Sequence, residues 1–283
     1  MKHNPAEPLI DLEELLTQRR TKWNARTYAQ RYERYFAPLR HQPLKILEIG
    51  IGGYDNPKEG GDSLRAWKRY FPNAQIYGVD IVDKSALQED RIQTFQGSQD
   101  DPAFLERVVA QTGKLDIIID DGSHRNDHVI ASFQLLFPAL ADDGGIYVVE
   151  DTHFSYVPNI PNWQKLTGGT TPPTWAQYGG ALDLYDRRTM MGFFKRLADC
   201  VSYQDFFNPG YQPNYFDLHL AGVHFYRNQI FVLKGDNTAP GNFFDKNNLR
   251  PEWLQMMGVA SADQLPGFQF PTIDDPTKAT TWK

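Results

Sequence analysis

Cysteine is nearly absent from this sequence, in which Cys200 is the only one among 283 residues. One cysteine excludes an intrachain disulfide framework, and its place at the end of an apolar helical pattern favours a buried structural thiol over a reactive one. No apolar run reaches the about 20 residues of a membrane-spanning helix, and the first residues lack the apolar core of a signal peptide. We therefore expect a cytoplasmic protein without a membrane partner.

An excess of positive charge is missing as well. The 29 lysines and arginines face 35 aspartates and glutamates, which gives a formal net charge of −6 at pH 7. Binding to nucleic-acid phosphates in general needs a basic surface, so we expect no nucleic-acid partner. Internal repeats and low-complexity tracts are also absent, and the length allows a sizeable buried core.

Short apolar runs alternate with helical patterns from Leu44 onward. The predicted strands cover residues 44–49, 75–79, 91–96, 115–119 and 145–149, and the helices between them cover residues 63–71, 102–111 and 127–136. This alternation predicts an α/β fold with a doubly wound, mostly parallel sheet. Two more alternating runs, at 219–226 and 229–233, predict an antiparallel hairpin at a sheet edge, for seven strands in all.

Other segments complete the predicted organisation. The predicted boundaries are 1–43 for an N-terminal helical arm, 44–235 for the main domain and 236–283 for a C-terminal tail. Apolar residues at helical spacing predict one long helix over residues 10–39 and another over residues 181–201, and Asp62 is a predicted N-cap. Proline, glycine, threonine and tryptophan are frequent in residues 154–180, which we interpret as a lid.

A glycine turn follows the first predicted strand directly, in Glu48-Ile49-Gly50-Ile51-Gly52-Gly53. Glycines let the backbone approach a ligand closely, and ligands of open α/β sheets bind at the carboxyl ends of the strands. Asp80 ends the next strand, where a carboxylate can accept both ribose hydroxyls of a nucleoside. A dinucleotide fingerprint would need a third glycine at Asp55 and a helix directly behind the turn. Both are missing, which favours a nucleoside cofactor without phosphates.

Polar residues also follow the third predicted strand, in Gly97-Ser98-Gln99-Asp100. Ser98 and Gln99 either hydrogen-bond the adenine edge of the cofactor or form the polar start of the next helix. Asp100 and Asp101 are better explained as caps of that helix.

Acidic pairs end the fourth and fifth predicted strands, in Asp120-Asp121-Gly122-Ser123-His124 and in Glu150-Asp151-Thr152-His153. Neighbouring strands lie about 5 Å apart, so these carboxylates would repel one another at one rim of the sheet unless a cation bound there. Oxygen ligands favour Mg²⁺, with Mn²⁺ or Ca²⁺ as alternatives. We predict a metal site made by Asp121, Glu150 and Asp151, with Asp120 facing the amino-acid end of the cofactor. The alternative is that these acids are helix caps and solvated loop residues.

His124 is the predicted general base. An imidazole in this turn can take a proton from a substrate hydroxyl, and a bound cation would make that hydroxyl more acidic. The resulting alkoxide would attack a sulfonium methyl group in line. His128 and His153 are weaker candidates, and His219 and His224 are expected in strand packing or on the hairpin surface.

Three segments in order carry a family resemblance. They are Leu47-Glu48-Ile49-Gly50-Ile51-Gly52-Gly53-Tyr54, Gly60-Gly61-Asp62-Ser63-Leu64-Arg65-Ala66-Trp67 and Asp120-Asp121-Gly122-Ser123-His124. Together they resemble the metal-dependent sugar O-methyltransferases of macrolide biosynthesis, over residues 22–156 and more loosely to residue 235. The resemblance implies the Rossmann-like fold of class I methyltransferases, S-adenosyl-L-methionine as cofactor and assembly into a homo-oligomer. It also implies Mg²⁺ at Asp121, Glu150 and Asp151, with His124 as base. The residues that we assign to the cofactor are Glu48, Gly50, Gly52, Gly53, Tyr54, Ser63, Asp80, Ser98, Gln99 and Asp120.

Methyl transfer to a sugar hydroxyl of a glycosylated natural product or glycan is the leading hypothesis, with a small-molecule glycoside as substrate. An oxidative enzyme that resembles the cephalosporin-hydroxylase-like relatives is one alternative, although iron usually prefers two histidines and one carboxylate. A non-catalytic S-adenosylmethionine-binding assembly protein is another. The large extra N-terminal domain of some relatives has no counterpart here, so we expect acceptor selection to differ. Trp163, Trp175 and Tyr178 either stack on a sugar or pin the lid.

Overall fold

A seven-stranded sheet organises the computed structural model of this chain, which describes residues 11–18, 25–160, 165, 168, 177–206, 211–245, 248–261 and 264. The strands are β1 Lys45–Ile49, β2 Gln75–Asp80, β3 Ile92–Gln96, β4 Ile117–Asp120, β5 Ile146–Glu150, β6 Leu220–Tyr226 and β7 Gln229–Lys234. Their order is β3-β2-β1-β4-β5-β7-β6. β1 pairs in parallel with β2 and β4, and β2 pairs in parallel with β3, whereas β6 and β7 are antiparallel. The predicted fold class is confirmed.

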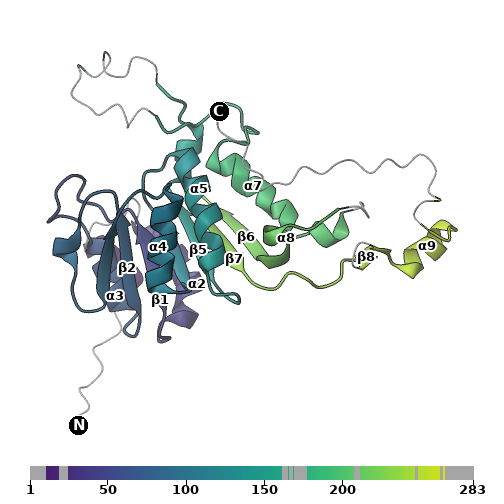
Figure 1. Ribbon diagram of the computed structural model, residues 1–283, viewed down its shortest axis with the longest axis horizontal. Coiled ribbons are helices and arrows are strands. Elements are labelled where there is room, and N and C mark those ends of the chain that lie inside the picture. Colours follow the sequence, from purple (N-terminus) through teal and green to yellow (C-terminus); the bar gives the residue numbers. More distant parts are fainter. Residues whose placement is uncertain are drawn as a thin grey trace, which may run out of the picture. The chain divides into compact units, whose positions relative to one another are not determined.

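The described helices precede, separate and follow the strands along the chain. They are α1 Leu12–Gln18, α2 Ala25–Phe36, α3 Asp62–Tyr70, α4 Pro102–Thr112, α5 Asn126–Leu136, α7 Met190–Cys200, α8 Tyr215–His219 and α9 Pro251–Met257. Short 3-10 helices are η1 Ala37–Leu39, η2 Ser85–Leu87, η3 Phe137–Ala139, η4 Thr152–Tyr156 and η6 Tyr203–Asp205. Figure 1 shows α4 in front of the parallel strands and α2, in purple, behind them. Both faces of the sheet are therefore covered, as a doubly wound fold requires.

The chain divides into two compact units. The first comprises Met1–His124, Ala131–Leu140 and Tyr147–Asp151, and the second comprises Arg125–Ile130, Ala141–Ile146 and Thr152–Lys283. In the first unit, isoleucine and leucine make up most of β1 and β4, and the side chains are buried from Ile46 to Ile49 and from Ile117 to Asp120. Consecutive buried side chains of this kind belong to parallel sheets that are covered on both faces.

One predicted helix proves to be two. The sequence pattern predicts a single helix over residues 10–39, but α1 and α2 pack against each other, which one straight helix cannot do. The predicted buried face is nevertheless confirmed, since Leu12, Tyr32 and Phe36 are fully buried. Hydrophobic spacing identifies the buried face of each helix, whereas it does not show that the pattern covers two helices.

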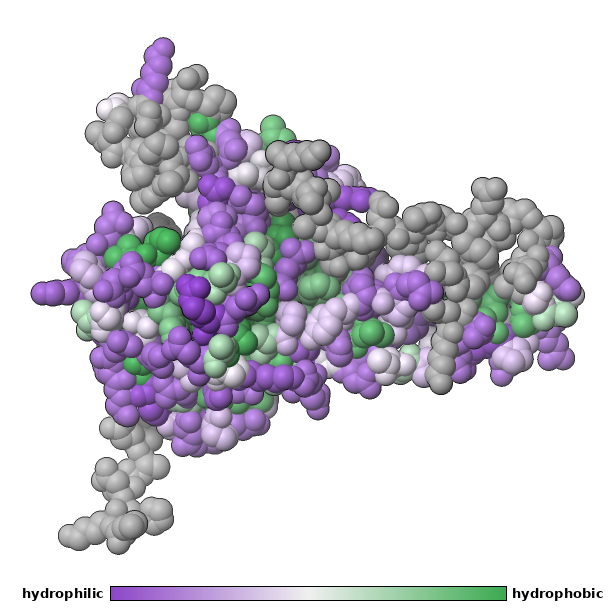
Figure 2. Space-filling view, in the orientation of Figure 1, coloured by the Kyte–Doolittle hydropathy of each residue, from purple (hydrophilic) through white to green (hydrophobic). Residues whose placement is uncertain are grey.

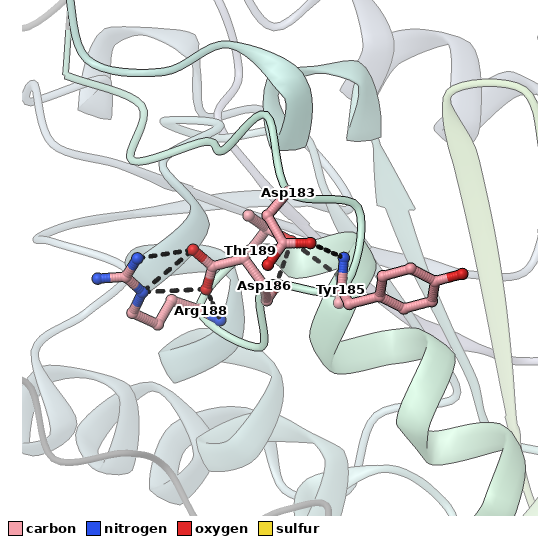
Figure 3. Close-up of polar contacts among 6 residues, drawn as sticks. Asp183, Tyr185, Asp186, Arg188 and Thr189 are labelled. Carbon is pink, nitrogen blue, oxygen red and sulfur yellow. Dashed lines mark hydrogen bonds and ion pairs between the residues drawn. The ribbon is translucent and has the colours of Figure 1, made fainter.

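Two helix starts differ from their predictions. Gly61 precedes α3 with a φ of 71°, so Asp62 is the first helical residue and not the N-cap. The helix predicted from residue 181 begins only at Met190, because the carboxylates of Asp183 and Asp186 accept hydrogen bonds from the backbone N–H groups two residues later. Such local side-chain bonds compete with helix formation. Figure 3 shows this turn, in which Arg188 also binds Asp186 and Thr189 caps α7.

The second unit contains the predicted hairpin of β6 and β7, which turns at Arg227-Asn228. Cys200, at the end of α7, is buried as predicted. A small antiparallel pair, β8 Phe244–Asp245 and β9 Asn248–Leu249, lies before α9 in the region that we assigned to an irregular tail.

The described surface is mixed in polarity. On the face that Figure 2 shows, hydrophobic residues lie in groups among hydrophilic ones. Among the described residues, no helix is both long and apolar enough to cross a membrane.

Candidate active site

The glycine turn after β1 has the backbone that its sequence predicts. Gly50, Gly52 and Gly53 have φ values of 78°, 73° and 77°, a region that side chains with a Cβ atom rarely adopt. A Cβ atom at Gly50 would collide with the carbonyl oxygen of Asp121, and one at Gly53 would collide with the carbonyl oxygen of Glu59. The turn therefore lies directly against the loop that follows β4, and its own chain folds back over it.

Asp80 ends β2 and is tied to this turn. Its Oδ2 accepts the N–H of Ile51 at 3.2 Å, and its Oδ1 accepts the N–H of Val82 at 2.9 Å. An ionised carboxylate has about four acceptor positions. Asp80 can consequently still accept hydroxyl groups of a ligand while it holds the turn in place.

Lys84 fastens the loop that follows the glycines, a role that the sequence pattern did not reveal. Its side chain is buried, and Nζ donates to the carbonyl oxygens of Tyr54 at 2.9 Å, Asn56 at 2.7 Å and Glu59 at 3.1 Å. A buried cation must be compensated, and here three carbonyl dipoles surround it. A lone lysine after a strand carries no local signal of this arrangement.

Three other residues that we assigned to the cofactor differ widely in exposure. Glu48 is fully buried, and its Oε2 accepts the indole N–H of Trp67 at 3.2 Å. Ser63 is buried in the first turn of α3, whereas Tyr54 is 79% exposed. Their assignment to the cofactor stays a prediction.

Asp120 lies in a buried polar network. Its carboxylate accepts hydrogen bonds from Gln99 Nε2 at 3.0 Å, Ser132 Oγ at 2.5 Å and Tyr147 Oη at 3.2 Å. Burial raises the pKa of Asp120, and the hydrogen bonds from Ser132 and Gln99 oppose that rise. Ser132 and Tyr147 were missed by the sequence pattern, because their spacing predicts only packing.

Gln99 joins this network to the loop after β4. Its Oε1 accepts the N–H of Ser123 at 2.7 Å, while its amide nitrogen reaches Asp120. The hydroxyl of Ser98 donates to the carboxylate of Asp100, and Asp101 caps α4 as predicted. Binding of the cofactor by Ser98, Gln99 and Asp120 stays a prediction.

A cluster of two acids and one histidine lies just beyond the ends of β4 and β5 and consists of Asp121, His124 and Asp151. One potential ligand atom of each residue lies within 4.8 Å of those of the other two. Nε2 of His124 lies 3.8 Å from Oδ2 of Asp151. The predicted meeting of two strand ends therefore occurs, since β4 and β5 are neighbours in the sheet.

Glu150 lies beside this cluster. Among the described residues, the compact group of potential ligand atoms comes from Asp121, His124 and Asp151. Glu150 is not a member of that group. Glu150 is buried, and its carboxylate accepts the hydroxyl of Tyr32. Its predicted role as a metal ligand stays a prediction.

Two tyrosines of α2 reach these acids, and the sequence pattern indicated only that they are buried. Tyr28 donates its hydroxyl to Oδ1 of Asp151 at 2.8 Å, and Tyr32 donates to Glu150. Burial raises the pKa of Tyr28 well above its ordinary value of 10.0, and the charges of Asp151, Glu150 and Asp121 add to that rise. The three acids thus act on one hydroxyl, which is consistent with a single convergent site.

In the second unit, Asn126 joins the two ends of segment 154–180. Its Nδ2 donates to the carbonyl oxygens of Phe154 at 3.2 Å and Tyr178 at 2.7 Å, and its Oδ1 accepts the N–H of Met190 at 2.7 Å. The rings of Tyr178 and Phe154 stack with centroids 4.0 Å apart. Tyr178 is therefore part of the base of the segment, whereas Trp163 and Trp175 lie outside the described residues.

The remaining histidines lie in different settings. His128 lies in the first turn of α5, and the ring of His153 lies 4.3 Å from that of Phe154. His219 ends α8 with its ring 4.3 Å from that of Tyr215, and His224 lies in β6. Of these residues, His219 belongs to a helix and not to the strand that we predicted.

The chain is similar in sequence to antibiotic-sugar O-methyltransferases, although no family model matches it. It is 42% identical over 216 residues to the mycinamicin VI 2''-O-methyltransferase of Micromonospora griseorubida, a match that covers 76% of this chain and 49% of that protein. It is 45% identical over 209 residues, 73% of this chain and 49% of the other, to a Streptomyces olivaceus 3'-O-methyltransferase that acts on a 2-methoxy-rhamnosyl tetracenomycin C.

Solved structures show similarity to the same group of enzymes. The MycE methyltransferase of the mycinamycin pathway, in complex with Mg and S-adenosylhomocysteine, matches with a TM-score of 0.71 at 40% identity over 82% of this chain and 55% of that chain. Over the matched residues, the chain belongs to this family of sugar O-methyltransferases. The chain spans about half the length of the curated relatives that it matches.

Proposed function

We propose that this chain is an S-adenosyl-L-methionine-dependent, Mg²⁺-dependent O-methyltransferase of a sugar hydroxyl on a glycosylated natural product. The observation that carries the proposal is the convergence of Asp121, Asp151 and His124 beyond two neighbouring strands. The kinship with sugar O-methyltransferases supports the reaction type, and the Mg and S-adenosylhomocysteine of the MycE structure support the cofactors.

The donor chemistry fits a hard divalent cation. We assign Asp121, Glu150 and Asp151 as the residues that would hold Mg²⁺, because carboxylate oxygens are its preferred protein ligands. Three nearby acids without a cation would repel one another. When bound, Mg²⁺ would lower the pKa of the acceptor hydroxyl.

The cofactor would lie at the glycine turn. Gly50 packs against the backbone of Asp121, so a ligand in this turn is next to the loop that carries the acids. Asp80 would accept the ribose hydroxyls, since two backbone N–H groups occupy only part of its acceptor capacity. This placement would bring the methyl donor and the acceptor hydroxyl to the same end of the sheet.

His124 would take the proton of the acceptor hydroxyl. As the oxygen–methyl bond forms, the sulfur–methyl bond breaks, which leaves a methyl ether, S-adenosylhomocysteine and a protonated imidazole. Oδ2 of Asp151, 3.8 Å from Nε2 of His124, is placed to stabilise that imidazolium. An iron site of the two-histidine type would need a second imidazole in the cluster, and the described cluster holds one.

We further propose a cytoplasmic homo-oligomer that takes small-molecule glycosides, with an arm at residues 1–43, a methyltransferase domain at 44–235 and a tail at 236–283. The family resemblance supports the assembly. Rhamnosyl tetracenomycin C and mycinamicin VI, which the names of two relatives give as acceptors, are the first candidates for trial.

The test is transfer of a deuterated methyl group. The purified chain is incubated with S-adenosylmethionine labelled at its methyl group, Mg²⁺ and each glycoside, and products are identified by mass. We expect a labelled methyl ether in the same molar amount as S-adenosylhomocysteine. S-adenosylhomocysteine should also raise the melting temperature of the chain. A melting temperature that rises with NAD but not with S-adenosylhomocysteine would contradict the proposal.

A further inference from the structure

Two tyrosines of α2 donate hydrogen bonds to consecutive acids at the end of β5. Tyr28 binds Oδ1 of Asp151 at 2.8 Å, and Tyr32 binds the carboxylate of Glu150. We infer that Tyr28 and Tyr32 are positioning residues that orient Asp151 and Glu150 toward a divalent cation. The inference rests on the metal site of the proposed function and extends it to α2.

The two oxygens of Asp151 have different neighbours. Oδ1 accepts the hydroxyl of Tyr28, while Oδ2 lies 3.8 Å from Nε2 of His124. Because a carboxylate is planar and rigid, a hydrogen bond that fixes one oxygen also fixes the direction of the other. Tyr28 thereby holds Oδ2 on the side of the residue on which His124 lies.

The backbone explains how two consecutive acids reach one helix. Successive side chains of a strand point to opposite faces, but Asp151 has a φ of 53°, which interrupts the extended conformation. Residues four apart on a helix lie on the same face. Tyr28 and Tyr32 have this spacing, so one face of α2 meets both acids.

The core holds the hydroxyl of Tyr32 in place. Its ring is fully buried, with centroids 4.9 Å from that of Phe36 and 5.1 Å from that of Trp67. Trp67 in turn donates to Glu48 of β1. The donor ring thus packs on α2 and α3, and Trp67 ties it to β1; outer partners that are held in this way fix the orientation of a ligand carboxylate.

Tyrosine suits this role because its hydroxyl is a neutral donor. A lysine or arginine at the same place would neutralise an acid that the cation needs, whereas a phenol orients the carboxylate and leaves its charge.

The experiment measures Mn²⁺ affinity of the full chain by electron paramagnetic resonance, in the wild type, Tyr28→Phe, Tyr32→Phe and the double variant. Each substitution removes one oxygen and keeps the ring. We expect each single variant to bind Mn²⁺ about 10- to 100-fold more weakly, while the affinity for S-adenosylhomocysteine stays within about twofold.

Tyr70→Phe is the matched control. Tyr70 donates to Oε2 of Glu33 at 2.8 Å, so this variant also removes a tyrosine–carboxylate bond to α2, at an acid that is not one of those at the end of β5. Its Mn²⁺ affinity should equal that of the wild type. The rise in melting temperature caused by Mn²⁺ gives a second measure in any variant of low stability.

The outcomes separate the inference from the function on which it rests. If the double variant binds Mn²⁺ as tightly as the wild type, or if Tyr70→Phe loses as much affinity as the other variants, the inference is overturned. The proposed metal site still stands in that case, because the wild type binds Mn²⁺. A wild type that binds S-adenosylhomocysteine but no Mn²⁺ would overturn the metal site itself, and the inference with it.

Discussion

His124 Nε2 lies 3.8 Å from Oδ2 of Asp151, and both residues have left-handed backbone conformations, with φ values of 56° and 53°. Residues other than glycine seldom adopt this region, and such strain is concentrated at functional sites. The shared conformation turns an imidazole and a carboxylate from two separate loops toward each other.

Replacement of His124 by asparagine should therefore slow methyl transfer without loss of cofactor binding. Removal of a positioned general base lowers a rate by about 10²- to 10⁴-fold. The measurement is S-adenosylhomocysteine production at saturating substrate, with His224→Asn in β6 as control. Activity of His124→Asn within a few-fold of the wild type would exclude the imidazole as base.

Asp121→Asn should abolish the stimulation of methyl transfer by Mg²⁺. The change removes a charged ligand, so the Mg²⁺ concentration for half-maximal rate should rise at least about tenfold. Excess EDTA should stop the wild-type reaction, and added Mg²⁺ should restore it. Asp90→Asn, at an exposed position, is the matched control. Full wild-type activity in EDTA would remove the metal from the mechanism.

Lys84→Met should loosen the loop that follows the glycine turn. The variant leaves three carbonyl oxygens without the donor that they now share, at a cost of about 1–3 kcal/mol in the free energy of unfolding. S-adenosylhomocysteine should bind more weakly, as isothermal titration calorimetry can show. Lys58→Met changes an exposed lysine of the same loop and should alter neither quantity. Equal cofactor affinity in Lys84→Met and the wild type would restrict Lys84 to a role in stability.

The chain should lose stability at alkaline pH through its buried tyrosines. Burial raises the pKa of Tyr147 well above its ordinary value of 10.0, and burial together with Glu33 raises that of Tyr70. Below about pH 10 the folded and the unfolded chain both hold these phenolic protons, so the stability that they contribute is fully present. Above about pH 10 the unfolded chain releases the protons first, and the free energy of unfolding falls as the pH rises.

Urea unfolding at several values between about pH 9 and about pH 11 checks this dependence. Tyr70→Phe should flatten the decline, because one of the retained protons is gone. If the free energy of unfolding falls equally steeply with pH in the wild type and in Tyr70→Phe, then Tyr70 ionises equally in the folded and the unfolded chain.

Local patterns predicted most of the sheet. Apolar runs located the parallel strands of the first unit, and their order followed from the general rule for doubly wound folds, so the meeting of Asp121 and Asp151 was predictable. The division of the first helical pattern into α1 and α2 was not predictable in this way. The late start of α7 was not predictable either, because the turns formed by Asp183 and Asp186 depend on side-chain hydrogen bonds within a polar stretch.

The supporting residues of the site were beyond the sequence pattern for a different reason. Tyr28 and Asp151 are 123 positions apart, and Tyr32 and Glu150 are 118 apart. Helical spacing shows that such tyrosines face the core, but it does not show which acid each hydroxyl will meet. Lys84 is similar, because its three partners are backbone atoms that any sequence would supply.

The side chain of Asn126 has a consequence for how members of this family can diverge. One amide holds the carbonyl groups of Phe154 and Tyr178, so the two ends of the intervening stretch are fixed to the start of α5. The residues between those ends can then be exchanged while Asn126 keeps both junctions in place. A chimera that receives this stretch from a relative should keep its fold and change its acceptor.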